Sequence, residues 1–232
     1  MDTTVGDAEP AGDPEPAAAL DPLVLVTEPD RDPAPATRAD GRTDGRAARA
    51  TRTRTQIVDA LLSLLEEGDL QPPASRIAER AGISLRLIYH HFGDLESLFR
   101  ATASREAERV AARITPIDMD LPLEARIDAI VEQRTSMLEW MTPVRRAALL
   151  QEPFSDELTA ARVRFAAAAE AGVRHVFARE LDQLDEVERE EVVTTVHGAL
   201  LWGLWNDLRT NGRDELAARA AVRRILRALL LR

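Results

Sequence analysis

One short stretch of the chain concentrates side chains that can bind nucleic acid. The hydroxyl groups of Ser84 and Tyr89 can donate to phosphate oxygens, and Arg86 can grip a phosphate or donate to both O6 and N7 of a guanine. His90 and His91 are adjacent, so on a helix they point about 100° apart and do not form a chelating pair for a metal. These residue types predict DNA contact and no metal site.

The residues just before this stretch predict the turn that would present it. Ile77 and Ala81 are spaced for the inner face of a helix over 74–81. Gly82 follows at the position where a left-handed backbone commonly ends a helix, and Ser84 is suited to the N-cap of the next one. The pattern is typical of a helix-turn-helix.

In the second helix of this motif, the apolar residues decide which side faces outward. Ile83 and Ile88 occupy the N′ and N4 positions and form a hydrophobic staple that fixes the angle of the turn. With Ile88 and Phe92 facing inward, the opposite side of the helix faces solvent, and such a helix presents its N-terminal residues to the major groove. The expected DNA contacts are Ser84, Leu85, Arg86, Tyr89, His90 and His91.

Apolar residues at helical spacing also surround the motif. A first helix is predicted from Arg54 to a stop at Gly68, and a long fourth helix, capped by Asp94, runs to about Ile114. After a loop at 116–122, prolines and turn residues punctuate further helical segments over 123–141, 144–151, 155–181, 185–210 and 213–231. No alternating strand pattern occurs, so the predicted fold class is all-α.

The stretch from Thr55 to Phe99 resembles the DNA-binding domain of the TetR family of bacterial transcription regulators. The residues that carry the resemblance are Ile77-Ala78, Ala81-Gly82-Ile83-Ser84, Tyr89-His90-His91-Phe92 and Glu96-Ser97-Leu98-Phe99. The whole stretch covers about a fifth of the chain, and these residues stand in it at specific spacing. The resemblance implies a transcription regulator, usually a repressor, that binds a palindromic operator in double-stranded DNA as a homodimer and is released by a small-molecule effector.

Three features depart from the family pattern. Pro72-Pro73 stand where a Thr or Ser usually caps the second helix and touches phosphate, although Ser75 offers a substitute hydroxyl. Leu95 replaces a common phosphate-binding Lys, and Arg86 and Leu87 are larger than the usual residues of the first turn of the recognition helix. We therefore expect phosphate anchoring to differ from the usual family scheme.

Charge is distributed unevenly along the first part of the chain. Residues 1–37 hold nine acidic residues against one Arg, a net charge of −8, and lack apolar periodicity, which predicts a disordered tail. Residues 38–54 have a net charge of +4, so most of the chain's formal charge of −10 belongs to the tail. The basic stretch over 38–53 is either a solvated linker or an arm that contacts DNA. In the second case the contacting residues would be Arg49, Arg52 and Arg54.

The sequence thus divides into the tail, the basic stretch, a helix-turn-helix domain over 54–100 and a ligand-binding and dimerisation domain over 101–232. The resemblance implies that the last two long helices pair with those of a second copy, through an apolar stripe of Val193, Val196, His197, Leu200, Leu204, Leu208, Ile225 and Leu229. Trp202 and Trp205 are interpreted as core or interface residues. An effector would lie between helices, with candidate contacts Met137, Trp140, Met141, Phe165, His175 and Phe177, for each of which core packing is the simpler interpretation.

Other classes of protein are less consistent with the sequence. Without Cys, disulfides and thiolate metal sites are excluded, and no apolar run approaches the roughly 20 residues of a membrane span. We find no secretory signal, phosphate loop, nucleophile elbow or HExxH pattern, so we expect a cytoplasmic bacterial protein with no catalytic residue, cofactor, metal or membrane partner. A helical adaptor whose acidic tail recruits another protein is the alternative.

Overall fold

The computed structural model describes residues 41–231, and within that range the chain is helical and contains no strand. The predicted disordered tail over 1–37 lies outside the described residues. In chain order the elements are α2 (Gly41–Glu66), α3 (Ala74–Ala81), α4 (Leu85–Phe92), α5 (Leu95–Ala111), α6 (Leu123–Gln151), the 3-10 helix η1 (Glu152–Phe154), α7 (Asp156–Val176), α8 (Ala178–Leu181), α9 (Glu186–Ala199), α10 (Trp202–Thr210) and α11 (Glu215–Leu230).

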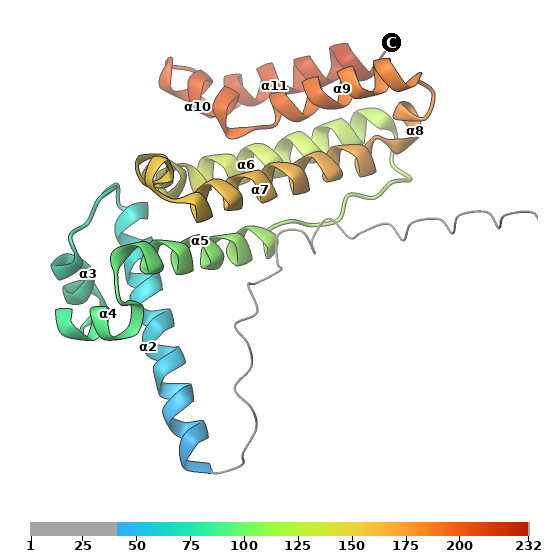
Figure 1. The fold of residues 1–232 in the computed structure, drawn as a ribbon. Coiled ribbons are helices and arrows are strands. Elements are labelled where there is room, and N and C mark those ends of the chain that lie inside the picture. Colours follow the sequence, from blue (N-terminus) through green and yellow to red (C-terminus); the bar gives the residue numbers. More distant parts are fainter. Residues whose placement is uncertain (1–40, 232) are drawn as a thin grey trace, which may run out of the picture.

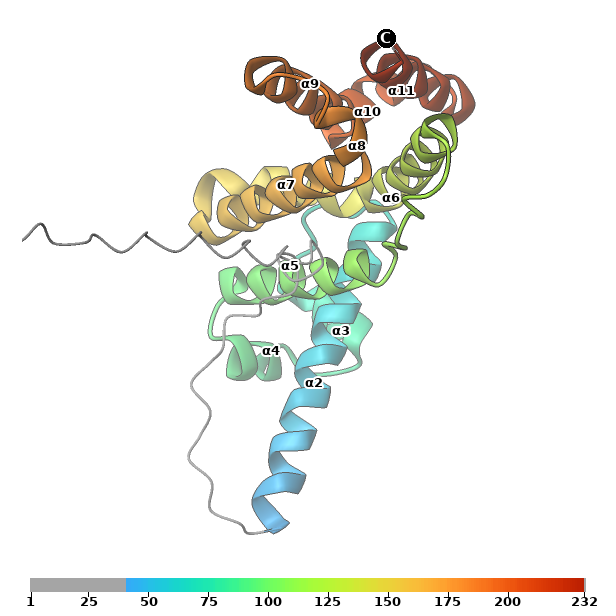
Figure 2. The same cartoon turned by 90° about the vertical axis from the view of Figure 1, so that its right-hand side faces the viewer.

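The helices form two units of unequal size, a small N-terminal unit and a C-terminal unit of α6 to α11, which α5 connects. In Figure 1, α2 to α4 make a small N-terminal unit, and α2 projects well beyond the other two helices. α6 and α7 lie side by side above α5, and α9 and α11 cover them on the far side; Figure 2 shows the same order after rotation. α5 packs against both α2 and α7, so it connects the two units.

Each unit has its own apolar core. The N-terminal core gathers buried residues of α2, α3, α4 and α5 around Leu61, Ile77 and Ile88, and it also receives Val144 and Ala147 from α6. The larger core joins α6, α7, α9 and α11 through buried aliphatic side chains and Phe177. None of the helices from α2 to α11 combines the length and apolar character that a bilayer crossing requires.

The first helix starts earlier than its sequence predicted. It begins at Gly41 instead of Arg54, so the described part of the basic stretch is helical and not an irregular arm. Ala and Arg, which favour helix, dominate residues 45–54, and the Thr51 and Thr53 hydroxyls donate to carbonyls four residues earlier, at 3.1 Å each.

Helix boundaries in the C-terminal unit also differ from the prediction. The segments predicted over 123–141 and 144–151 form one helix, α6, with Pro143 inside it. The segment predicted over 185–210 is two helices, because Leu201 adopts an extended backbone with φ −83° and ψ 156° and turns α10 away from α9. The prediction over 155–181 breaks at Phe177, between α7 and α8.

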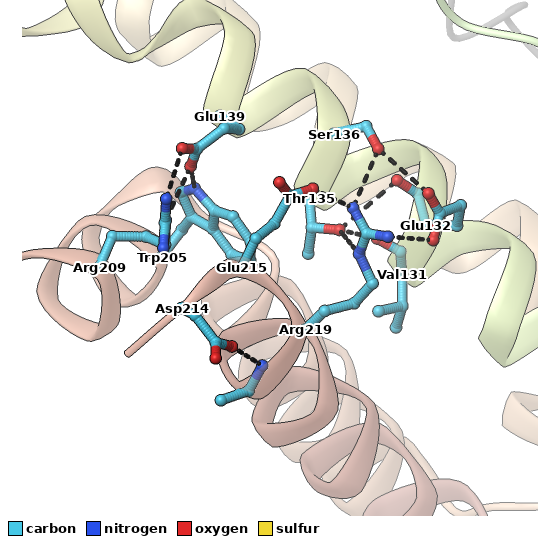
Figure 3. A network of polar contacts seen from close by, with 11 residues as sticks. Val131, Glu132, Thr135, Ser136, Glu139, Trp205, Arg209, Asp214, Glu215 and Arg219 are labelled. Atoms are coloured by element: carbon cyan, nitrogen blue, oxygen red, sulfur yellow. Dashed lines mark hydrogen bonds and ion pairs between the residues drawn. The ribbon is translucent and has the colours of Figure 1, made fainter. Parts of the chain in front are cut away.

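Polar contacts fasten the last helices to α6. Figure 3 shows Glu139 accepting from the indole N–H of Trp205 at 2.8 Å and from two nitrogens of Arg209 at 3.1 and 2.9 Å. Hydrogen bonds from Arg209 and Trp205 hold the pKa of Glu139 below its usual value. Arg219 of α11 similarly donates to Thr135 at 3.1 Å on the neighbouring turn of α6. The network fixes α10 and α11 on α6.

A second polar cluster lies where the two units meet. Arg109 of α5 donates to Glu66 of α2 at 2.5 Å and lies over the ring of Trp140 of α6, 4.8 Å from its centroid. It also donates at 3.2 Å to Glu106, whose other carboxyl oxygen is buried without a partner in the described part of the chain. Burial raises the pKa of Glu106 from 4.5 to about 7.

Glu106→Gln should change how stability depends on pH. The folded protein binds the Glu106 proton more tightly than the unfolded chain, so this contribution is full below pH 4.5 and is lost as pH rises through 7. The neutral amide removes that loss. Between pH 5 and pH 8 we expect the free energy of unfolding of the wild type to fall by about 2 kcal/mol more than that of the variant. Urea unfolding at both pH values measures the difference. Parallel pH profiles would contradict the assignment.

Candidate nucleic-acid interface

The turn between α3 and α4 has the predicted helix-turn-helix geometry. Gly82 adopts a left-handed backbone, with φ 65° and ψ 33°, and the N–H of Ile83 donates to the carbonyl of Ala78 at 3.0 Å. Ser84 is extended at the N-cap position of α4, with φ −80° and ψ 149°. Its side chain makes no capping hydrogen bond, contrary to the role predicted for it, so its hydroxyl is available for another partner.

α4 presents the side that the sequence predicted. Ile88 and Phe92 are buried in the N-terminal core, while Arg86 and Tyr89 are exposed. Neither of these two side chains makes a hydrogen bond or ion pair within residues 41–231. Leu85 and His90 are also exposed, and His91 is half-buried. A rigid helix thus carries free donors on its outer face.

Arg54, a predicted DNA contact, makes contacts within the chain. Its guanidinium lies over the ring of Phe92, 4.3 Å from the centroid, and donates a hydrogen bond to the carbonyl of His91. A cation at this place satisfies the C-terminal end of α4 and complements its dipole. Burial lowers the pKa of His91, and the charges of His90 and Arg54 act in the same direction. Arg54 therefore positions α4 on α2.

The projecting part of α2 carries a separate set of cations. Arg46, Arg49 and Arg52 are exposed, and no ion pair engages them within the described chain. At 1.5 Å per residue they extend over roughly 9 Å of helix, beyond the end occupied by Arg54. Arg49 and Arg52 are among the predicted DNA contacts and Arg46 is not. All three lie on the single continuous helix α2 (Figure 1).

α3 contributes fewer free groups. Ser75 is exposed in its first turn, and Pro73 at the N-cap provides no side-chain hydrogen bond. Arg76 and Arg80 are already paired: Arg76 with Asp69 at 3.1 Å, and Arg80 with Glu67 at 2.6 Å. Hydrogen bonding to Arg80 lowers the pKa of Glu67. These pairs hold α3 against the end of α2 and leave Ser75 as its predicted contact.

The six predicted ligand contacts do not form one site. Met137 and Trp140 line a cavity of about 690 Å³ between α6 and the segment 113–121. Phe177 is fully buried in the larger core, and His175 is exposed on the surface of α7. Met141 packs near Leu138 and Trp205, while Phe165 is half-buried on α7. The spacing of apolar residues along a helix does not show which other helix packs against each of its turns.

The predicted dimer stripe is divided in the same way. Val193, Val196 and Leu200 are buried by their own chain, so they are core residues and not a free surface. The remaining members are half-buried, namely His197, Leu204, Leu208, Ile225 and Leu229. An apolar stripe forms equally well against a helix of the same chain, which is why the prediction failed for the first three. Trp205 is buried and Trp202 half-buried, as their interpretation required.

Comparison with known sequences finds a family that the turn and its flanking helices resemble. Residues 57–102 match the family described as bacterial regulatory proteins, tetR family. The "HTH-type transcriptional regulator BetI" of Cronobacter sakazakii is 38% identical over 84 residues, covering 34% of this chain and 41% of that protein. BetI of Burkholderia ambifaria is 31% identical over 106 residues, covering 41% and 51%. The chain thus spans about half or less of these curated relatives.

Solved structures extend the similarity of fold to the C-terminal helices. A tetR-family transcriptional regulator from Streptomyces coelicolor has a TM-score of 0.63 and 21% identity, covering 77% of this chain and 79% of that one. A protein of Mesorhizobium loti ascribed to the same family has a TM-score of 0.55 and 17% identity, covering 79% and 97%. The predicted all-α fold with an N-terminal helix-turn-helix is confirmed.

Proposed function

We propose that this chain, whose residues 57–102 match the tetR family of bacterial regulatory proteins, is a DNA-binding transcriptional repressor that acts as a homodimer. The observation that carries the proposal is the outer face of α4, where Arg86 and Tyr89 are exposed and unpartnered beside the free hydroxyl of Ser84. Such groups on a rigid helix suit base edges and phosphates of a major groove.

In this proposal α4 enters the major groove and α2 follows the DNA backbone. The free arginines of α2 would supply phosphate contacts that the departures at Pro72-Pro73 and Leu95 remove. Two copies would place their recognition helices about one helical turn apart, roughly 34 Å, on a near-palindromic operator. Half-buried apolar residues of α10 and α11, among them Leu204 and Ile225, would contribute to the contact between the copies.

Release of DNA would depend on a small molecule bound among the C-terminal helices. The cavity at Trp140 adjoins the end of α5, and α5 packs on α2, so a ligand that shifts α5 changes the orientation of the DNA-binding unit. The effector needs to favour the non-binding arrangement by only a few kcal/mol. This role requires neither catalysis nor a membrane, and a bacterial cytoplasm is its natural setting.

A band-shift assay on the promoter next to the protein's own gene tests the proposal. We expect a sequence-selective, salt-sensitive complex at nanomolar protein, with the stoichiometry of a dimer. Absence of selectivity over an unrelated duplex would reject it. Deleting residues 1–37 separates the adaptor alternative: unchanged operator binding with loss of a protein partner would assign the acidic tail to recruitment.

Tyr89→Ala should weaken operator binding without unfolding the protein. The side chain is 46% exposed and supports no core contact, so its removal leaves the apolar packing of α4 intact. We expect affinity to fall about 10-fold, since one hydrogen bond and one apolar contact to DNA are lost. Fluorescence anisotropy measures the affinity, and circular dichroism checks the fold. Unchanged affinity would show that α4 faces DNA by another side.

A further inference from the structure

Arg134 is a buried cation without a counter-charge. It lies midway along α6 with only 8% of its surface exposed, and it makes no hydrogen bond or ion pair with any described residue. The other buried arginine of α6, Arg126, is fully engaged: Glu180 accepts from it at 2.9 and 2.5 Å, and the Val176 carbonyl at 2.5 Å. The contrast shows that this fold can pair a buried guanidinium, yet it leaves Arg134 unpaired.

Leaving a guanidinium in this state is unfavourable. A buried charge without a partner carries a desolvation penalty that no Coulombic attraction offsets. For Arg134 burial alone lowers the pKa, to about 10, and no carboxylate acts against it. The group still remains a cation at neutral pH. Groups held in such unfavourable surroundings are common at binding sites, where a ligand supplies what the fold lacks.

The surroundings of Arg134 offer a second unpartnered polar atom. His197 of α9 has a buried Nδ1 with no hydrogen-bond partner in the described chain. Burial lowers the pKa of His197, the charge of Glu170 opposes that effect and the charge of Arg134 adds to it, so all three lie within electrostatic reach. Glu170 accepts a hydrogen bond from Arg174 at 2.8 Å. It therefore does not neutralise Arg134.

A glycine lies beside the guanidinium of Arg134. Gly172 of α7 faces it, and a methyl group added there would lie 3.8 Å from Nη2 of Arg134. The neighbouring residues Val131, Leu138 and Val173 are buried and apolar. The guanidinium therefore lies among buried apolar residues of α6 and α7.

We propose that Arg134 and His197 form the anion-binding end of a second small-molecule site, separate from the cavity at Trp140, that takes a small organic carboxylate. The planar fork of the guanidinium would hold both carboxylate oxygens, and the ring N–H of His197 would add a third donor. The apolar part of the ligand would lie among the side chains of α6 and α7. The coupling of this site to DNA release rests on the proposed function; the binding of the carboxylate does not.

Thermal unfolding of the full chain with matched probes tests carboxylate binding. Sodium hexanoate and sodium benzoate are compared with hexanamide and benzamide, at constant ionic strength set by sodium chloride. We expect at least one carboxylate to raise the Tm by about 5 °C at concentrations far above its Kd, and its amide to have no such effect. Equal shifts for acid and amide, or no shift with either carboxylate, would overturn the proposal.

Arg134→Met provides an independent test, because the proposal predicts that this variant is more stable than the wild type. Removing an unpaired buried charge should raise the Tm of the ligand-free protein and abolish the carboxylate shift, whereas Arg134→Lys should retain a weaker one. Arg126→Met is the matched control, and it should lower the Tm because Glu180 loses its partner. If Arg134→Met lowers the Tm as the control does, Arg134 has a structural partner and the proposal fails.

A DNA-binding measurement then separates the two proposals. The carboxylate that raises the Tm should lower the operator affinity of the wild type at least about 10-fold and leave that of Arg134→Met unchanged. A thermal shift without any operator binding would reject the proposed repressor while keeping the carboxylate site. Operator binding without a thermal shift would reject the site and keep the repressor.

Discussion

Replacing Arg46, Arg49 and Arg52 together by Gln should lower operator affinity by about 100-fold or more at 0.1 M salt. Each of these exposed, unpaired cations would neutralise one phosphate and release its counterion. Their loss should therefore reduce the slope of log K against log[salt] by about 3 and weaken operator and unrelated DNA alike. Gln preserves the helix because its helix propensity is close to that of Arg. Anisotropy titrations at several salt concentrations give both quantities.

Two controls test whether the loss of affinity comes from the projecting part of α2 or from the change in net charge. Arg54→Gln removes the same charge from the same helix, but Arg54 is engaged by Phe92 and the His91 carbonyl, so it should reduce affinity with little change of the salt slope. A triple replacement of exposed arginines in the C-terminal unit, at Arg164, Arg179 and Arg213, matches the change in net charge. If that control weakens binding as much as the α2 triple variant, the effect is global and α2 does not touch DNA.

The same arginines show what local sequence can and cannot predict. The composition of residues 38–54 shows their positive charge. It does not show whether they form a helix or an irregular arm, since both have the same net charge. The helix continues to Gly41 because no proline interrupts it after that point, and it tolerates the glycine at Gly45. Since α2 is one continuous helix, Arg46 joins Arg49 and Arg52 among its unpaired cations, while Arg54 contacts Phe92 and the His91 carbonyl. Continuity of a helix is a cooperative property that residue types alone predict poorly.

The helix-turn-helix was predictable in detail because its chemistry is local. A left-handed Gly82, an extended Ser84 and the inward Ile88 each follow from residues within one or two turns. The cap hydrogen bond of Ser84 was the part that failed, because a cap position does not oblige the hydroxyl to turn inward. For Asp94 the corresponding bond exists, to the N–H of Ser97 at 2.7 Å.

The sequence does not predict which helices of the C-terminal unit pack together, or which of their polar side chains pair. Val193 and Val196 have the spacing expected of an interface, yet α6, α7 and α11 of the same chain cover them. Arg126 and Arg134 are two turns apart on α6 and look alike in the sequence, but only Arg126 meets a carboxylate, from α8. Which polar groups pair depends on helices far apart along the chain. The same dependence explains why the ligand candidates scattered over several environments.

Trp205→Ala should produce the largest loss of stability of any single replacement considered for the C-terminal unit. Trp205 is 1% exposed and lies between Leu138 of α6 and Ala218 of α11, so its removal leaves a cavity that rigid helices fill only in part. It also deprives Glu139 of one of its donors. We expect the free energy of unfolding to fall by about 4 kcal/mol and the Tm by roughly 10 °C, measured by urea and thermal unfolding.

The other tryptophan of this region is the matched control for that loss. Trp202 also donates through its indole N–H, to the Thr142 hydroxyl at 3.0 Å, but it is only half-buried. Trp202→Ala should therefore cost about 1 to 2 kcal/mol, while Trp205→Phe, which keeps most of the packing and loses only the hydrogen bond to Glu139, should lie between the two Ala variants. Equal losses for Trp202→Ala and Trp205→Ala would mean that α10 is not anchored through Trp205. In that case the burial of the Trp205 indole would not explain why the chain breaks at Leu201 and turns α10 toward α6.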